Sequence, residues 1–295
     1  MKKICILLAT FNGELYLKEQ IRSLLKQVNV NITLVVSDDL SSDKTVKILK
    51  KYKKFKIIFL ENSLRHGSAG RNFLSMIERV DFSLYDYVSF SDQDDIWYED
   101  KLANSLNFLE ENKHFIAVSS CVNAFWMNQK SLFVKKSFSQ TDYDHIFEAA
   151  GPGCTYLMKT ELIYKIQQLI QEKKWIYEEV ALHDWLIYSY ARENGYKWHI
   201  LPYSTLDYRQ HSNNQLGVNS GIVASLNRLQ KFNNGWYFDQ IYSISRAVGS
   251  ELKLNKLFTS RSKPTFHYFK NFWKMRRDKL DGFLLLLCIV LKIIK

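Results

Sequence analysis

The chain has 295 residues, of which 46% are hydrophobic and 15% aromatic, so its composition excludes a disordered chain and supports a sizeable core. The net charge of +11 favours a polyanionic partner: a nucleic acid, an anionic lipid surface or a phosphorylated substrate. The four cysteines are scattered without a CxxC pair, which indicates reduced thiols and excludes a disulfide framework or a zinc site.

Strands are predicted to alternate with helices through the first 121 residues. Lys3–Ala9 is a continuous apolar run, typical of a parallel strand that is buried on both faces. It is too short for a signal peptide, and no cleavage site follows it. The further predicted strands are Ile32–Ser37, Phe55–Leu60, Tyr87–Ser91 and Phe115–Cys121, and the helices are Glu14–Gln27, Thr45–Tyr52, Ala69–Val80 and Lys101–Glu111. This order indicates an α/β fold with a mostly parallel, Rossmann-like central sheet flanked by helices.

Polar clusters follow three of the predicted strands. Thr10–Gly13 comes after the first strand, Asp38-Asp39 after the second, and Asp92–Asp95 after the fourth. Ligands of open α/β sheets bind beyond the carboxyl ends of the strands, so we expect these clusters to converge on one site. The dinucleotide fingerprint GxGxxG and the P-loop are both absent.

Three carboxylates crowd the end of the fourth strand. A solvated turn that opens a helix explains one or two of Asp92, Asp94 and Asp95. All three repel one another unless something positive lies between them. A hard divalent cation with oxygen ligands would neutralise them and would hold a phosphate-bearing substrate.

Several stretches together resemble the family 2 glycosyltransferases, which have the GT-A fold. They are Ala9–Gln27, Ser37–Thr45, Ser89–Trp97, Leu182–Tyr188 and Tyr208–Gly217. The FSDQDDIW and HDW motifs are similar to those of the branch that contains bacterial rhamnosyltransferases of cell-surface polysaccharides. The resemblance covers roughly residues 1–220 and implies a nucleotide-sugar half over about 1–121 and an acceptor half over about 122–220. A helical C-terminal region then occupies 221–295.

The resemblance also implies a donor site. The Phe11 ring stands where it can stack on a pyrimidine base, and Asp39 stands where a carboxylate accepts a hydrogen bond from that base; Asp38 and Asp39 also read as helix caps. Arg71 opens a helix beside the donor, which suits phosphate, although a solvated surface arginine fits equally. The implied donor-binding residues are Thr10, Phe11, Asn12, Asp38, Asp39, Arg71, Asp92, Gln93 and Arg209.

A metal site is implied at the DxD motif, Asp92-Gln93-Asp94. The cation would be Mg²⁺ or Mn²⁺, bridging the donor diphosphate. Asp94 is the expected ligand, with Asp92 near the ribose or the metal. His211 belongs to a late loop that closes over the phosphates or the metal, and imidazole suits Mn²⁺ better than Mg²⁺.

The reaction needs a base on the face of the sugar opposite the leaving group. Asp184 matches the base of the family, with a plain helix N-cap as the alternative, and Glu178 or Glu179 as further candidates. A single displacement by such a base inverts the anomeric centre. The residues implied at the acceptor are Gly153, Cys154, Thr155, His183 and Trp185, although a tight turn also explains Gly151–Thr155.

The C-terminal region changes character from Lys256 onward. Its apolar run, Gly282–Leu291, is too short for a spanning helix, which needs about 20 residues. Basic and aromatic residues beside such a run suit the plane of an anionic membrane, with packing on the domain or on a partner subunit as the alternative. Those residues are Lys263, Phe266, Tyr268, Phe269, Lys270, Phe272, Trp273, Lys274, Arg276, Arg277 and Lys279.

The sequence therefore predicts a metal-dependent inverting glycosyltransferase on the inner face of the cytoplasmic membrane. It would move a sugar from a nucleotide-sugar donor, dTDP-rhamnose by branch resemblance, to a saccharide or lipid-linked acceptor in capsule, O-antigen or cell-wall polysaccharide synthesis. UDP-hexose and UDP-N-acetylhexosamine are the alternative donors. A nucleotidyltransferase would need a glycine-rich basic loop that Thr10–Gly13 lacks, and a non-catalytic module would not need Asp92, Asp94 and Asp184. Nucleic acid is not an expected partner, because the positive charge gathers beside the apolar C-terminal run; an oligomer stays open.

Overall fold

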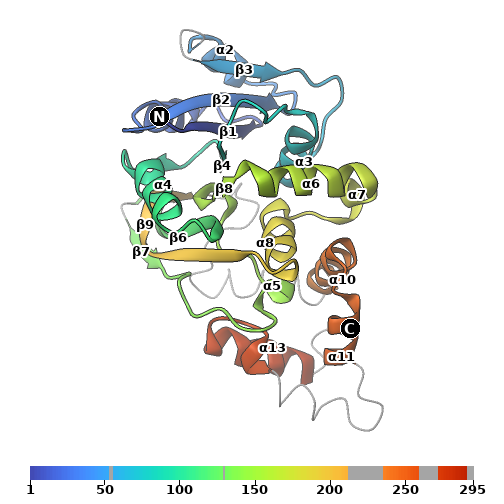
Figure 1. The fold of residues 1–295 in the computed structure, drawn as a ribbon. Coiled ribbons are helices and arrows are strands. Elements are labelled where there is room, and N and C mark those ends of the chain that lie inside the picture. The colour runs from blue at the N-terminus through green and yellow to red at the C-terminus, as the bar shows by residue number, and fades with distance from the viewer. Residues whose placement is uncertain (53–55, 129, 212–234, 259–271, 291–295) are drawn as a thin grey trace.

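The computed structural model describes residues 1–52, 56–128, 130–211, 235–258 and 272–290. Within these ranges a nine-stranded mixed sheet runs through the molecule with helices on both faces (Figure 1). The hydrogen-bonded order is β3-β2-β1-β4-β8-β6-β9-β5, and β7 pairs with β6. The strands are β1 Lys3–Thr10, β2 Asn31–Asp38, β3 Ile57–Leu60, β4 Tyr87–Ser91, β5 Ile96–Trp97, β6 Phe115–Trp126, β7 Ser131–Val134, β8 Leu157–Lys159 and β9 Lys197–Gln210.

The helices occupy the segments between these strands. The α-helices are α1 Leu17–Leu25, α2 Thr45–Lys50, α3 Ala69–Arg79, α4 Lys101–Glu111, α5 Asp144–Phe147, α6 Thr160–Glu172, α7 Ile176–Glu179, α8 His183–Glu193, α10 Trp236–Val248, α11 Glu251–Phe258 and α13 Lys279–Val290. Two 3₁₀ turns, η1 Gly153–Thr155 and η2 Phe272–Lys274, complete the set. The predicted β-α alternation through the first 121 residues is confirmed, with element ends shifted by a few residues.

The strand β1 is buried on both faces, as its unbroken apolar run predicts. Its alternate side chains belong to two different cores, since successive residues of a strand point to opposite faces. Cys5 and Leu7 pack in the larger core with residues of α3, α6, α8 and α10. Ile4 and Ile6 pack in the second core with residues of α1, α2 and α4. The sheet around β1 is therefore covered by helices on each side.

The second half of the sheet is not purely parallel. β1 pairs in parallel with β2 and β4, but β8 runs antiparallel to both β4 and β6. β6 then runs parallel to β9 through several register shifts, as far as Phe125 opposite Arg209 and Trp126 opposite Gln210. The predicted strand Phe115–Cys121 is thus too short, and β9 was not predicted. The long β6–β9 pair carries Arg209 to the edge where β1, β2 and β4 also end.

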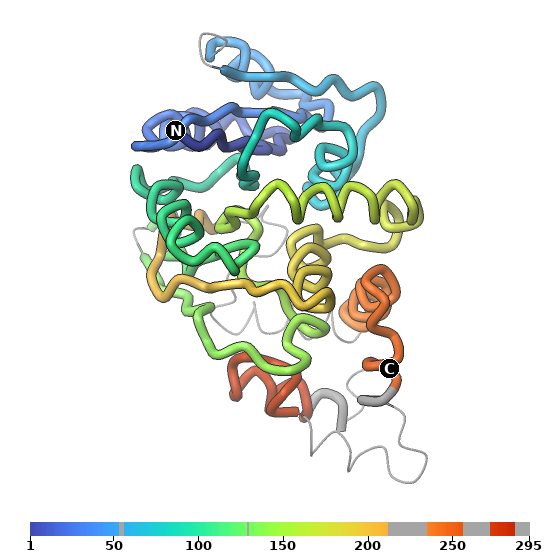
Figure 2. The backbone as a smooth tube through the Cα atoms, in the orientation of Figure 1, coloured from blue at the N-terminus to red at the C-terminus, as the bar shows by residue number. Residues whose placement is uncertain are grey.

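The C-terminal region packs into the domain. Tyr237 and Ile241 of α10 and Leu285 of α13 lie in the larger core. Figure 2 shows α13 at the opposite end of the molecule from the segment of α2 and β3. Among the described residues, no helix combines the length and the apolar character that crossing a bilayer requires. The predicted boundary near residue 220 lies outside the described residues.

Two arginines of this region do not face a membrane, contrary to the sequence prediction. Arg277 is buried and donates to Asp144 Oδ2 at 3.0 Å and to Glu148 Oε2 at 3.3 Å. Arg276 donates to the Phe147 carbonyl at 3.0 Å and lies 3.8 Å from Glu148 Oε2. The basic run is partly an internal ion-pair network, because Asp144 at the start of α5 and Glu148 just after its end pair with these arginines.

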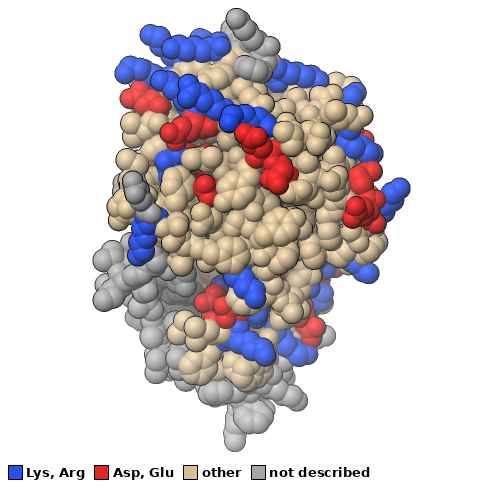
Figure 3. All heavy atoms as spheres, turned by 90° about the vertical axis from the view of Figure 1, so that its left-hand side faces the viewer, with Lys and Arg blue, Asp and Glu red and all other residues tan. Residues whose placement is uncertain are grey.

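The sequence predicted that positive charge gathers in the C-terminal region, but it is not confined there. Lys and Arg side chains gather at the end of the molecule that carries α2 and β3 (Figure 3). Lys47 and Lys50 belong to the last turn of α2. The acidic side chains on this face lie mainly below that end, so the surface has a basic end and a mixed middle.

Candidate active site

The polar clusters predicted to converge do lie at one edge of the sheet. β1, β2 and β4 are parallel, so Thr10, Asp38 and Asp92 end up at their common carboxyl edge. β6 and β9 run in the same sense and end at the same edge with Arg209 and His211. A candidate site therefore forms where five strand ends meet.

The tip of β1 is fixed by a side chain from the DxD motif. Gln93 accepts a hydrogen bond from the Phe11 N–H and donates one to the Phe11 carbonyl, both at 2.9 Å. A Cβ at Gly13 would lie only 2.3 Å from Gln93 Oε1, so only glycine leaves room for this clamp. Asn12 has a positive φ of 46° and accepts from the Ser42 N–H at 2.9 Å, which ties the tip to the next loop. Gln93 thus holds the half-buried Phe11 in place.

Asp38 and Asp39 have different surroundings. Asp38 accepts from Thr10 Oγ1 at 2.8 Å and from the Ser41 N–H at 2.8 Å, so it closes the turn after β2. Asp39 is buried and accepts from the backbone N–H groups of His66 at 2.5 Å and Gly67 at 2.9 Å. The sequence predicted that Asp38 and Asp39 bind the donor or cap a helix. In the structure Asp38 stabilises the turn after β2, and the buried Asp39 holds the loop of His66 and Gly67. A donor role for either stays a prediction.

The carboxylate cluster (Asp92, Asp94, Asp95) is strongly perturbed. Burial, and then the charges of Asp94 and Asp184, raise the pKa of Asp92 to about 7. Burial, and then Asp94 and Asp92, raise the pKa of Asp95 well above its usual range. Asp95 is fully buried and its Oδ2 accepts no hydrogen bond from the part of the chain that the structure describes, whereas Asp92 and Asp94 are partly exposed. Burial and the neighbouring carboxylates thus both disfavour the charged forms of Asp92 and Asp95.

Cys154 and Lys101 lie behind this cluster. Ligand atoms of Asp92, Asp95 and Cys154 fall within 4.8 Å of one another. Burial raises the pKa of the Cys154 thiol well above its usual range, so it stays protonated near neutral pH. Lys101 is buried over the Trp97 ring, its Nζ 3.5 Å from the centroid, and burial lowers its pKa to about 7. Cys154, predicted at the acceptor, is thus a buried neighbour of the carboxylates.

His211 and Arg209 contact the loop of Asp94. His211 Nε2 lies 2.7 Å from Asp94 Oδ2, and the imidazole stacks on Tyr16 with centroids 5.1 Å apart. Arg209 donates from Nε to the Asp94 carbonyl at 2.8 Å and also bonds Glu19. Both residues contact Asp94 of the DxD motif directly, and the metal role of His211 and the donor role of Arg209 stay predictions.

Asp184 opens α8 next to η1. It is partly exposed, and its Oδ1 accepts from the Trp185 N–H at 2.8 Å. Burial raises its pKa to about 6, against the opposing effect of hydrogen bonds from the backbone of Trp185 and Gly153. A Cβ at Gly153 would approach Asp184 Cβ to 3.2 Å and His183 Nε2 to 2.9 Å. The glycine therefore lets η1 pack directly against the start of α8.

His183 and Trp185, both predicted at the acceptor, are mostly buried. His183 stacks on Phe73 with centroids 4.3 Å apart, and burial lowers its pKa to about 3. Trp185 donates its indole N–H to the His145 carbonyl at 2.8 Å. Thr155 is also buried and donates to the Pro152 carbonyl at 2.7 Å. These contacts hold Asp184 in position, and an acceptor role for these residues stays a prediction.

Arg71 and the alternative bases lie around α7. Arg71 Nη2 donates to the Glu178 carbonyl at 3.2 Å, and its own N–H is capped by Ser68 Oγ. The carboxylate of Glu179 pairs with Arg246 at 3.3 Å. In this structure the Arg71 guanidinium is thus engaged with α7, and Glu179 already has a cationic partner.

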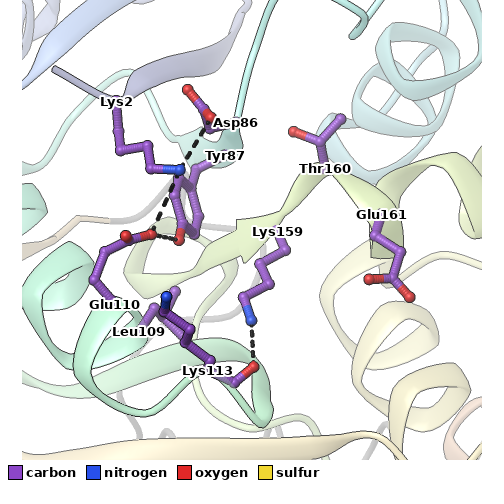
Figure 4. Close-up of a pocket in the computed structure, with 9 residues that line it drawn as sticks. All are labelled: Lys2, Asp86, Tyr87, Leu109, Glu110, Lys113, Lys159, Thr160 and Glu161. Atoms are coloured by element: carbon purple, nitrogen blue, oxygen red, sulfur yellow. Dashed lines mark hydrogen bonds and ion pairs between the residues drawn. The ribbon is translucent and has the colours of Figure 1, made fainter.

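A hollow of about 350 Å³ lies at the other edge of the sheet, near the amino ends of β1 and β4 (Figure 4). Lys2 Nζ lies 3.3 Å from Asp86 Oδ1 and 3.8 Å from Glu110 Oε1. Tyr87 donates its hydroxyl to Glu110 at 2.5 Å. Lys2, Asp86 and Glu110 thus form ion pairs with one another. None of the predicted site residues lines this hollow.

The family model that matches residues 5–166 is described as glycosyl transferase family 2. The chain belongs to this family. The dTDP-rhamnosyl transferase RfbG of Shigella flexneri is 38% identical to it over 289 residues, which are 97% of this chain and 100% of RfbG. The UDP-Glc:alpha-D-GlcNAc-diphosphoundecaprenol beta-1,3-glucosyltransferase WfaP of Escherichia coli is 32% identical over 121 residues, 41% of this chain and 46% of WfaP. The chain is a glycosyltransferase, as the sequence predicted.

The fold of this family 2 glycosyltransferase is the predicted GT-A fold. It resembles the crystal structure of S. aureus TarS 1-349 in complex with UDP-GlcNAc, with a TM-score of 0.56 at 17% identity. The match covers 99% of this chain and 82% of that chain. The match extends through the helical C-terminal region, in agreement with the packing of α10 and α13 in the core.

Sequence reasoning missed two residues of this edge. Arg65 lies with its guanidinium 3.9 Å from the centroid of the Phe11 ring. Lys101 is a buried cation that interacts electrostatically with Asp95 and Cys154. Arg65 gives no local signal, because its partner lies 54 positions away by residue number. Lys101 opens the predicted helix Lys101–Glu111 seven residues after Asp94, and nothing in that local pattern marks its side chain as buried.

Proposed function

We propose that the chain is a metal-dependent inverting glycosyltransferase that transfers rhamnose from dTDP-rhamnose to a saccharide or lipid-linked saccharide of a cell-surface polysaccharide. The identity with the dTDP-rhamnosyl transferase RfbG, which runs over nearly the whole chain, carries the choice of donor. The site supports the reaction type, because it sets one partly exposed carboxylate, Asp184, against the carboxylate cluster. The partial match to WfaP supports a UDP-linked hexose as the second candidate donor and a lipid diphosphate as the acceptor.

Asp184 would act as the general base. Its raised pKa of about 6 gives a carboxylate that is charged at neutral pH and is more basic than an ordinary aspartate. The backbone N–H groups of Trp185 and Gly153 would hold this carboxylate in place, and a carboxylate lone pair would take the proton of the incoming acceptor hydroxyl. Attack on C1 from that side expels the nucleoside diphosphate from the opposite side, so the anomeric centre inverts.

The carboxylate cluster fits a divalent cation. Asp92 and Asp94 offer hard oxygen ligands and are partly exposed, which suits Mg²⁺ or Mn²⁺. His211 touches Asp94 and would complete or support the ligand set, while the protonated thiol of Cys154 would stay outside it. When bound, such a cation stabilises the negative charge that develops on the leaving diphosphate. Gln93 would hold Phe11 against the base.

A nucleotide-sugar panel tests this function. With Mg²⁺ or Mn²⁺ and a saccharide acceptor present, we expect the purified protein to release nucleoside diphosphate from dTDP-rhamnose faster than from UDP-glucose or UDP-GlcNAc. EDTA should stop the release, and Asp94→Ala should abolish donor binding while the far-UV circular dichroism stays unchanged. Full turnover in EDTA would remove the metal from the proposal, and a preference for a UDP-sugar would replace the donor.

The C-terminal region would hold the enzyme at an anionic membrane, on the cytoplasmic face where lipid-linked acceptors are found. Four apolar side chains of η2 and α13 are exposed even though the same segments bury Phe272 and Leu285. The exposed side chains are Trp273, Leu280, Phe283 and Leu284. Exposed Lys279 lies among them. Apolar side chains flanked by lysine suit the boundary between lipid headgroups and acyl chains.

We expect Leu280→Glu with Phe283→Glu to weaken sedimentation with phosphatidylglycerol vesicles without changing the melting temperature, because both side chains are exposed. Leu84→Glu is the matched control, since Leu84 and Leu280 are both 66% exposed. High salt should weaken wild-type binding only in part, because the lysine contribution of about 1 kcal/mol each is screened and apolar insertion is not. Equal vesicle binding by the double variant and the control would rule out this surface.

A further inference from the structure

Arg65 lies on the ring of Phe11, the aromatic side chain that the proposed function places at the nucleobase. Its guanidinium carbon is 3.9 Å from the centroid of Phe11, which is stacking distance. The side chain of Arg65 is 53% exposed and lies 3.8 Å from Asp39 Oδ2, while the Asp39 side chain is only 4% exposed. A half-exposed guanidinium thus covers the Phe11 ring and is paired with a buried carboxylate.

The loop that carries Arg65 is anchored at both ends. Asn62 donates to Ser37 Oγ at 2.9 Å and to the Asp38 carbonyl at 2.8 Å. At the other end, Asp39 accepts from the N–H groups of His66 and Gly67. Gly67 has a φ of 81°, a left-handed conformation that favours glycine. Asp39 therefore fixes the backbone on the C-terminal side of Arg65 and attracts its side chain, which returns the guanidinium over the tip of β1.

The platform beneath Arg65 is more rigid than Arg65 itself. Both backbone polar groups of Phe11 are bonded to Gln93, and Gly13 leaves Gln93 no space to spare. The Arg65 side chain can rotate into solvent, whereas the Phe11 backbone cannot move without breaking two hydrogen bonds. An incoming base would displace the guanidinium and not the ring.

We infer that Arg65 is a nucleobase-binding residue, which stacks on the outer face of a base whose inner face lies on Phe11. This rests on the proposed function, since it assumes that Phe11 holds the base of the donor. The planar guanidinium is suited to stacking on an aromatic face, and its N–H groups can donate to the carbonyl oxygens of thymine or uracil. When a base enters between them, the guanidinium would move away from Phe11 by about the thickness of an aromatic ring. The attraction of Asp39 would keep the Arg65 side chain near the base.

The test compares dTDP with inorganic pyrophosphate as ligands in calorimetric titrations with Mg²⁺ or Mn²⁺. Arg65→Ala should weaken dTDP binding about tenfold, the size of a partly desolvated cation–π contact, and leave pyrophosphate binding unchanged. Arg65→Lys keeps the positive charge but loses the planar guanidinium, so its affinity for dTDP should lie between those of the wild type and Arg65→Ala. Arg22→Ala removes one exposed arginine charge from α1 and should bind dTDP like the wild type.

Each other outcome decides against the inference. Unchanged or tighter dTDP binding by Arg65→Ala would mean that the guanidinium merely fills the ring face of the ligand-free protein. Equal losses for dTDP and pyrophosphate would make Arg65 a phosphate-binding residue. If the wild type binds neither dTDP nor UDP, the proposed function itself fails and the inference with it, whereas wild-type binding with an unaffected Arg65→Ala removes Arg65 alone.

Discussion

Asp184→Asn is expected to lower turnover by about 10²–10⁴-fold and to leave donor affinity close to the wild type. The amide is nearly isosteric with the carboxylate, and its oxygen can still accept from the Trp185 N–H, but it cannot take a proton from the acceptor. Initial rates of nucleoside diphosphate release, with donor affinity measured by calorimetry, separate the two effects. The matched control is Glu179→Gln, which alters a carboxylate already paired with Arg246 and should keep the wild-type rate.

The pH profile gives the same prediction a second readout. The pKa of Asp184 is raised to about 6, so below that pH the carboxyl is protonated and cannot act as a base. The rate at saturating substrate should therefore fall as the pH drops through about 6, with the enzyme still folded. Any residual rate of Asp184→Asn should lack this acidic limb. A rate that barely changes in Asp184→Asn, together with a large loss in Glu178→Gln or Glu179→Gln, would move the base to α7.

The nucleotide-binding half could be predicted from the sequence because its signals are local. A strand that is buried on both faces must be apolar throughout, and β1 is, with its alternate residues in two different cores. Where such a strand leaves the core the residues become polar, as at Thr10, Asp38 and Asp92. Parallel pairing then places these ends at one edge.

The remainder depends on contacts between residues that lie far apart in the chain. β9 contains Pro202 and many polar residues, and it pairs with β6 through several register shifts, so no two-residue period marks it. Arg65 reaches Phe11 only because Asp39 folds the intervening loop. The sequence around Arg276 and Arg277 does not tell whether these side chains face lipid or the protein interior. The position of α5, which packs Asp144 against Arg277, settles it.

Asp144→Ala is expected to lower the free energy of unfolding by about 3–5 kcal/mol, the usual cost of leaving buried charges unpaired. Asp144 is fully buried and accepts from Arg192 Nη1 at 2.9 Å, Arg277 Nη1 at 3.0 Å and the Tyr188 hydroxyl at 2.6 Å. Its removal leaves Arg192 and Arg277 without this carboxylate, while Arg277 keeps its contacts with Glu148 and the Ala149 carbonyl. Urea denaturation followed by circular dichroism measures the change.

The control is a neighbouring ion pair at the surface. Lys274 Nζ lies 2.7 Å from Asp142 Oδ2, but these side chains are 51% and 63% exposed, so Asp142→Ala should cost about 1 kcal/mol or less. The contrast tests whether the C-terminal region belongs to the folded core, because Arg277 is one of its residues. Similar small losses in both variants would mean that the segment is only loosely attached. A chain truncated after Ser262 should then fold and keep its activity, whereas a large loss in Asp144→Ala predicts that this truncation does not fold.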